Sequence, residues 1–185
     1  MLIAVRQMCR ALQGKTNTSS ADHVMSDEGH DTAEYSNWIK SRVGAMGDRP
    51  ILLYQSLQVA PLFLYGHYQK AAELARECFD NLDSVWSARN TRFTMLFYGL
   101  SLSGLIWQKA QDPRVPDKRS LPAEIGEVLK ELAMLRKKIV EWQAINDVNY
   151  LSWSTLLDAQ IAELQGDHGS TISFYEASLD HSAIN

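Results

Sequence analysis

The sequence predicts an all-α protein, an irregular TPR-like array of about seven to eight helices in antiparallel pairs. Hydrophobic residues recur at steps of three and four along most of the 185-residue chain. No stretch alternates apolar and polar residues beside a hairpin turn. Polar stretches that contain glycine or proline separate the periodic segments. Because 45% of the residues are hydrophobic, such a chain can bury a core.

The periodic segments place the helices in order along the chain. The first helix is expected at residues 2–13, and the second from Asp31 or Thr32, either of which can cap it, up to a loop at 44–50. The remaining helices are expected at residues 51–65, 68–86, 90–110, 121–144, 148–165 and 168–182.

Three local features refine these helices. Pro61 should kink or end a helical turn, because it cannot donate a backbone hydrogen bond. Either Asn146 or Asp147 can cap the helix that follows the break at 145–147. The apolar run at 93–107 predicts a helix that is buried on most sides.

The domain organisation follows from composition. A leading helix at 1–13 is expected to join, through a polar linker loop at 14–30, a TPR-like helical domain at 31–185. Gly14 can end the leading helix as a C-terminal cap, and Lys15 suits the negative end of the helix dipole.

Composition and charge narrow the classes of partner and compartment. The net charge of −4 is spread over both signs, which argues against nucleic acid as the partner. The apolar run at 93–107 is shorter than the roughly 20 residues that cross a bilayer, so no membrane partner is expected. Cys9 and Cys78 lack metal-ligand spacing and are expected to be small buried thiols in a reducing, cytoplasmic setting.

Two helix-to-helix turns resemble each other, "LYGHYQKAAELA" at 64–75 and "LQGDHGSTISFYEAS" at 164–178. Each has a leucine, a glycine two positions later, an aromatic residue or histidine that opens the next helix, and then a small residue. These positions are Gly66, Tyr68 and Ala71 in the first turn, and Gly166, His168 and Thr171 in the second. The pattern resembles the turn inside a tetratricopeptide (TPR) repeat, where the glycine takes a positive φ and the aromatic residue lies between the helices. A plain helical bundle that uses glycine as a helix stop is the alternative.

Longer stretches resemble one helical region of the large fungal hybrid histidine kinases. The most specific are "LDSVWSARNTRF" at 82–93 and "WQAINDVNYLSW" at 142–153, and the likeness extends from "ALQGKT" to "FYEASLDHSAIN". These kinases combine Ser/Thr-kinase-like, AAA-type ATPase, TPR-like, GAF, histidine-kinase and receiver modules. The resemblance implies a helical region without catalytic residues, since the catalytic modules of the family lie outside the stretch that this chain resembles.

Two short motifs resemble those of an NTPase, but the residues around them do not fit that class of enzyme. Gly14-Lys15-Thr16 ends like a phosphate-binding loop, and Asp27-Glu28-Gly29-His30 has the shape of a DExH box. A phosphate loop needs an earlier glycine, where this chain has Cys9, and it follows a strand, where this chain has a predicted helix. Both motifs are therefore interpreted as parts of a solvated loop.

A metal site and a docking patch are the remaining candidates. The loop residues that could ligate a metal lack the helical spacing of zinc ligands, so no metal or cofactor is expected; they are His23, Asp27, Glu28, His30 and Asp31. The basic run Arg136, Lys137 and Lys138 is either a solvated helix face or a docking patch for an acidic partner. Trp142 and Trp153 flank the break at 145–147 and are expected to pack together across it.

The sequence thus predicts a non-catalytic interaction or linker region of a two-component signalling kinase. Its partners would be proteins, either other modules of the same kinase or other signalling proteins. An NTPase or an enzyme that assists phosphotransfer is the first alternative, and a purely structural spacer is the second.

Overall fold

The computed structural model describes residues 2–42, 47–85, 89–113 and 120–183. Within these ranges the regular structure is helical, apart from one isolated backbone pair between Asp27 and His30, which confirms the predicted all-α class. Eight helices have ten residues or more. In chain order the elements are α1 (Leu2–Leu12), the 3-10 turn η1 (Ala21–His23), α2 (Thr32–Ser41), α3 (Arg49–Leu64), α4 (Tyr68–Asp80), α5 (Leu82–Val85), α6 (Arg89–Gln111), α7 (Leu121–Gln143), α8 (Asp147–Gln165) and α9 (His168–Ala183).

Most predicted helix ends agree with the structure because a capping residue fixes them. The Asp31 side chain accepts the Glu34 N–H at 2.8 Å, so Asp31 rather than Thr32 caps α2. In the same way Asn146 caps α8 by accepting the Asn149 N–H. Gly14 has a φ of 68° after α1, as expected of a C-terminal cap.

Pro61 lies in the last turn of α3 and does not end the helix, which continues to Leu64. The helix expected at 68–86 stops at Asp80 instead, because the Asn81 side chain donates to the Glu77 carbonyl at 2.9 Å and a short helix, α5, begins at Leu82. The predicted end at residue 86 lies outside the described residues, as do parts of the loops expected at 44–50 and 111–120.

The chain forms two compact units, one ending at Ser101 and the other beginning at Leu102. The division falls inside α6, whereas the sequence suggested boundaries after residues 13 and 30. No helix in the described ranges is long and apolar enough to cross a membrane.

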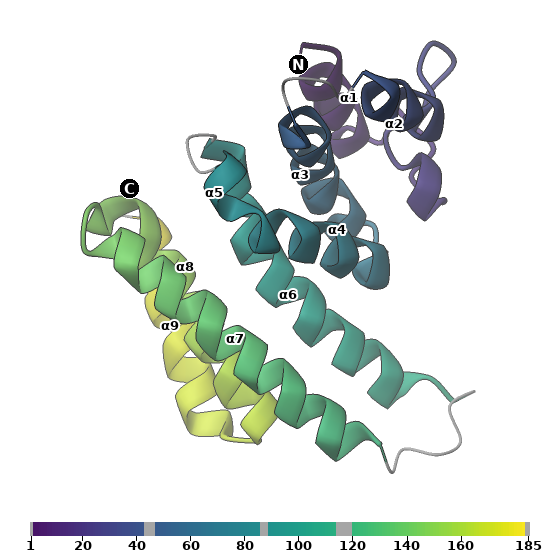
Figure 1. The fold of residues 1–185 in the computed structure, drawn as a ribbon. Helices are drawn as coiled ribbons and strands as arrows, with labels where there is room; N and C mark the ends of the chain where they lie inside the picture. Colours follow the sequence, from purple (N-terminus) through teal and green to yellow (C-terminus); the bar gives the residue numbers. More distant parts are fainter. Residues whose placement is uncertain (1, 43–46, 86–88, 114–119, 184–185) are drawn as a thin grey trace. The chain divides into compact units, whose positions relative to one another are not determined.

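The first unit is organised around α3, which contacts α1, α2 and α4 (Figure 1). Ten of its sixteen side chains are buried, so α3 is surrounded rather than amphipathic. In the second unit α8 contacts both α7 and α9, as Figure 1 shows in green and yellow. The buried side chains of the second unit include Leu132, Leu135 and Ile139 from α7 and Leu157 from α8.

The segment at 14–30 differs from the expected linker. Val24 and Met25 are fully buried. The Gln7 amide donates to the Met25 carbonyl at 3.0 Å, and the Thr16 hydroxyl donates to the Val24 carbonyl at 2.7 Å. His67, at the start of α4, hydrogen-bonds the Thr18 carbonyl at 2.9 Å. These contacts make the segment part of the first unit, since buried backbone carbonyls need such partners.

Candidate functional site

The two glycine turns have the same backbone geometry. Gly66 and Gly166 have φ values of 79° and 77°, in the left-handed region that favours glycine. In each turn the N–H after the glycine donates, at 2.9 Å, to the carbonyl five residues earlier. The small residues Ala71 and Thr171 are buried in the helices that follow. The backbone and the small position thus recur as the sequence suggested.

The third position of the pattern differs between the turns. The Tyr68 ring lies 5.6 Å from the ring of Phe63 on α3, and Phe63 in turn lies 5.4 Å from Phe97 on α6. His168 is exposed at the start of α9. An aromatic contact between the two helices is therefore present at Tyr68, while the exposed His168 side chain does not lie between helices.

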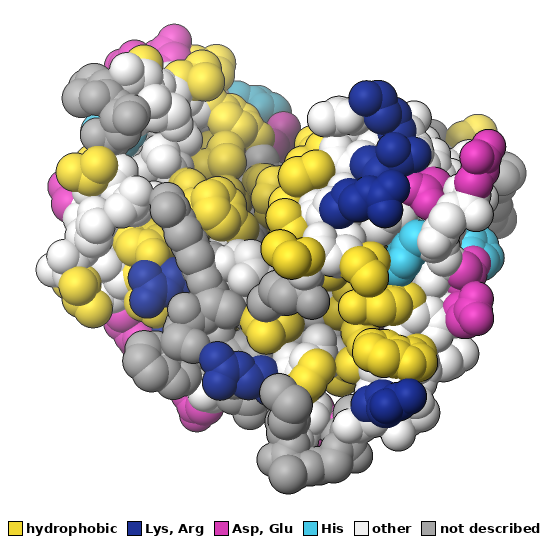
Figure 2. Space-filling model, turned by 90° about the horizontal axis from the view of Figure 1, so that it is seen from above, with side chains coloured by type: hydrophobic (Ala, Val, Ile, Leu, Met, Phe, Trp, Pro, Cys, Tyr) yellow, Lys and Arg dark blue, Asp and Glu magenta, His cyan; other side chains and the backbone are white. Residues whose placement is uncertain are grey.

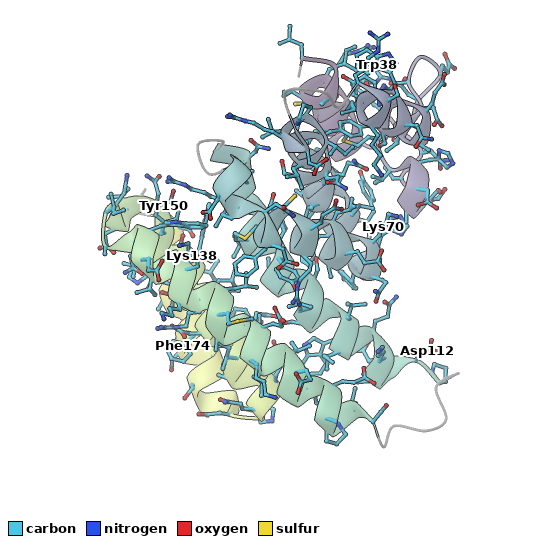
Figure 3. The ribbon with its side chains drawn as sticks, viewed as in Figure 1. Trp38, Lys70, Asp112, Lys138, Tyr150 and Phe174 are labelled. Carbon is cyan, nitrogen blue, oxygen red and sulfur yellow. The ribbon has the colours of Figure 1, made fainter. Side chains whose placement is uncertain are left out.

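The basic run on α7 makes contacts within the second unit. Arg136 forms a two-pronged ion pair with Asp158 on α8, and this hydrogen bonding raises the pKa of Arg136. Lys138, labelled in Figure 3, pairs with Glu141 at 2.9 Å, and Lys137 is exposed. Arg136 therefore joins two helices, and a docking patch here would depend on the two lysines.

The tryptophans beside the α7–α8 turn are joined through a tyrosine. The Tyr150 ring, labelled in Figure 3, lies 5.8 Å from Trp142 and 5.2 Å from Trp153. Tyr150 is buried, while both tryptophans are half-buried. The two tryptophans, which were expected to pack together, thus each contact Tyr150, and the cluster packs α7 against α8.

The residues of the two NTPase-like motifs belong to a packed loop. Arg10 of α1 forms an ion pair with Asp27 at 2.6 Å. A hydrogen bond from Gln7, the Gly29 N–H and the Arg10 guanidinium hold the pKa of Asp27 at about 2. Asp27 therefore fastens the loop to α1. Within the described ranges, no three His, Cys, Asp or Glu side chains come close enough together to hold a metal ion.

His30, the last residue of the DExH-like motif, faces the core of the first unit. Its Nε2 lies 3.0 Å from the Tyr54 hydroxyl, and burial lowers its pKa. Its ring also contacts Tyr35, at 5.0 Å between centroids. His30 is thus a packing residue of the α2–α3 contact.

The first unit has an apolar groove of about 590 Å³. It lies between α1, α3 and the first turns of α6. Its lining is almost entirely hydrophobic and consists of Val5, Met8, Leu12, Leu57, Ala60, Leu64, Phe93 and Phe97, with Ser56, Asn90 and Thr94 at one side. Leu64 is 58% exposed and Phe93 is 41% exposed. Large apolar side chains left open to water in one concavity mark an interaction site.

Helix α1 supplies one wall of this groove because it has two apolar faces. Ala4, Gln7 and Ala11 are buried in the unit, while Val5, Met8 and Leu12 line the groove. Cys9 was expected to be a buried thiol, but it is exposed, because it lies outside the face of α1 that carries the buried residues. Two features of the sequence could have revealed the groove. The short helix α1 has more apolar residues than its buried face uses, and Leu64 is a large apolar residue beside the turn at Gly66.

A second hollow of about 390 Å³ lies beside α2 and has aromatic walls. Trp38, labelled in Figure 3, stacks on Tyr35 at 5.6 Å and carries the Arg42 guanidinium 5.4 Å from its ring centre. Figure 2 shows hydrophobic atoms beside Lys and Arg atoms on this side of the first unit. Trp38 is half exposed, so the first unit has exposed aromatic as well as aliphatic surface.

Comparison with protein-family models, with curated proteins and with solved structures found no match. The function must therefore be inferred from the residues of this chain.

Proposed function

We propose that this chain is a non-catalytic helical interaction region of a signalling protein, and that the groove between α1, α3 and α6 binds an apolar segment of a protein partner. The observation that carries the proposal is the groove itself, whose open leucine and phenylalanine side chains would gain free energy on being covered. A groove lined in this way suits the apolar face of an amphipathic helix.

The resemblance to fungal hybrid histidine kinases supports a choice of partner. In those kinases a TPR-like helical region lies between an AAA-type ATPase module and a GAF module. We infer that the groove contacts one of these modules, inside the cytoplasm, and so links nucleotide-dependent and sensory parts of the kinase. The glycine turns with their buried small residues agree with a TPR-like arrangement.

Titration calorimetry of the full chain against isolated ATPase-type and GAF modules tests this proposal. One of the modules should bind, and Leu64→Glu should weaken binding about tenfold or more, since it places a charge in the apolar contact. Leu179→Glu is the matched control, because Leu179 is 69% exposed on α9 and is not among the residues that line the groove.

Two results would contradict the proposal. Absence of binding to both modules at about 100 μM would leave the structural spacer as the better description. An equal loss of binding in Leu64→Glu and Leu179→Glu would show that the contact is not made through the groove. A dye that fluoresces on apolar surfaces provides a second readout, which Leu64→Glu should lower and Leu179→Glu should lower less.

A further inference from the structure

A third hollow lies on the other side of α2 and has a different chemistry. It measures about 410 Å³ and is bounded by η1, α2, α3 and α4. Its lining includes two lysines and three side-chain amides: Lys40 and Asn37 from α2, Gln55 and Gln58 from α3, and Lys70 from α4. All of these elements belong to the first unit. The hollow is large enough for a small organic molecule.

Gln55 is a buried amide in the wall of this hollow. Its Nε2 donates to the Glu77 carboxylate at 2.7 Å. A carboxylate accepts hydrogen bonds, so this contact fixes which amide atom is the nitrogen. Its Oε1 is left buried without a hydrogen-bond partner among the described residues, on a side chain that is 94% buried. Less than 1 Å² of this Oε1 is exposed, so the atom is closed to a ligand in the hollow, and Gln55 contributes a part of the wall that its hydrogen bond to Glu77 holds in place.

The charges around the hollow favour an anion. Lys40 and Lys70 each bring a positive charge, whereas Asp22 is the one carboxylate in the lining. Lys70 lies 3.4 Å from Asp22, which is mostly exposed, and Figure 3 labels Lys70 on α4. Within the described ranges Lys40 has no carboxylate within 4.0 Å, so its charge is available to a ligand.

We propose that this hollow binds a small hydroxylated anion, with its acidic group held by Lys40 and Lys70. The amides of Gln58 and Asn37 supply both donors and acceptors for its hydroxyls. Amides and lysines together recognise a polyol that carries a phosphate or a carboxylate. This site is independent of the apolar groove, because none of its lining residues belongs to the groove.

Calorimetry with four probes separates the parts of this chemistry. Ribose 5-phosphate and gluconate carry hydroxyls with a phosphate or a carboxylate, and the stronger binder identifies the acidic group. Butyl phosphate keeps the charge without the hydroxyls, and ribose keeps the hydroxyls without the charge. At least one of the first two should bind about tenfold more tightly than both of the controls, which is about 1.4 kcal/mol.

Variants locate the binding. Lys40→Gln should weaken the preferred probe about tenfold, while Lys130→Gln, an exposed lysine on α7, should leave its affinity within about twofold. In the unchanged chain, the side-chain amide NMR signals of Gln58 and Asn37 should shift on addition of the probe. Absence of binding by all four probes at about 10 mM would overturn the proposal. So would equal affinities for butyl phosphate and ribose 5-phosphate with no preference for gluconate, or equal losses in the two lysine variants.

Discussion

The two glycine turns share a backbone and differ in what surrounds it. Gly66 and Gly166 have nearly equal φ values and close the same backbone hydrogen bond. After Gly66, the Tyr68 ring packs on Phe63, and the preceding His67 hydrogen-bonds the loop at Thr18. After Gly166, His168 is exposed, and the preceding Asp167 caps α9 through Ser170.

The difference separates two ways of stabilising a helix pair. Glycine sets the turn in both cases, because a positive φ is open to it at little cost. The first pair is then held by tertiary contacts to α6 and to the loop, whereas the second is held locally, by a side chain that satisfies the first N–H groups of its own helix.

The largest expected difference is between Tyr68→Ala and His168→Ala. Removal of the Tyr68 ring should cost about 2 kcal/mol of local stability, since it opens space beside Phe63. Removal of the exposed His168 side chain should change stability by less than about 0.5 kcal/mol. Hydrogen–deuterium exchange, measured separately on peptides from α4 and α9, reports each helix pair by itself. Equal effects in the two peptides would show that the aromatic position is not what distinguishes the turns.

The sequence predicted the turns better than it predicted their surroundings. Glycine spacing, capping residues and hydrophobic periodicity are local, so the bounds of α2, α8 and α9 could be predicted to within one or two residues. Whether Tyr68 or His168 meets a neighbouring helix depends on residues of other elements, such as Phe63 on α3. Local periodicity contains no such information.

The same limit applies to the candidate sites. The basic run on α7 was visible as a motif, but its partner Asp158 lies 22 residues away on α8, so the ion pair could not be predicted. The groove and the polar hollow both arise where three or more elements meet. Buried amides such as Gln55 look like ordinary surface residues in a sequence, and only the fold shows that one of its atoms lacks a partner.

Alanine at either turn glycine should lower the stability of the chain by the same amount, which is smaller than the loss expected for Tyr68→Ala. Gly66→Ala and Gly166→Ala should each cost about 1 kcal/mol, because a Cβ at positive φ is strained although no other atom lies near it. Gly126→Ala is the matched control, since Gly126 lies within helix α7 with open space around it and an ordinary φ. That substitution should stabilise α7 by about 0.5–1 kcal/mol. Urea unfolding checks all three signs, and a stabilising Gly66→Ala would contradict the assigned turn geometry.

The smallest expected difference between the two turns is their response to acid, which protonates the Asp167 cap of α9. Hydrogen bonds from the Ser170 hydroxyl and N–H lower the pKa of Asp167 below its ordinary value of 3.8. The folded chain therefore binds this proton less tightly than the unfolded chain does. The stabilisation is complete above pH 3.8 and is lost as the pH falls through the lowered pKa. The residue at the equivalent position of the first turn is His67, so α4 has no carboxylate cap to lose.

Protection of backbone amides in the first turn of α9, relative to the first turn of α4, should therefore fall on acidification below about pH 4. Each exchange rate is divided by the rate of an unstructured peptide at the same pH, so that only structure is compared. Asp167→Asn is the informative variant, because asparagine keeps a capping oxygen but does not titrate. The acid dependence at α9 should disappear in Asp167→Asn while the cap remains. If it persisted unchanged, another carboxylate would be responsible, and the two turns would not differ through their caps.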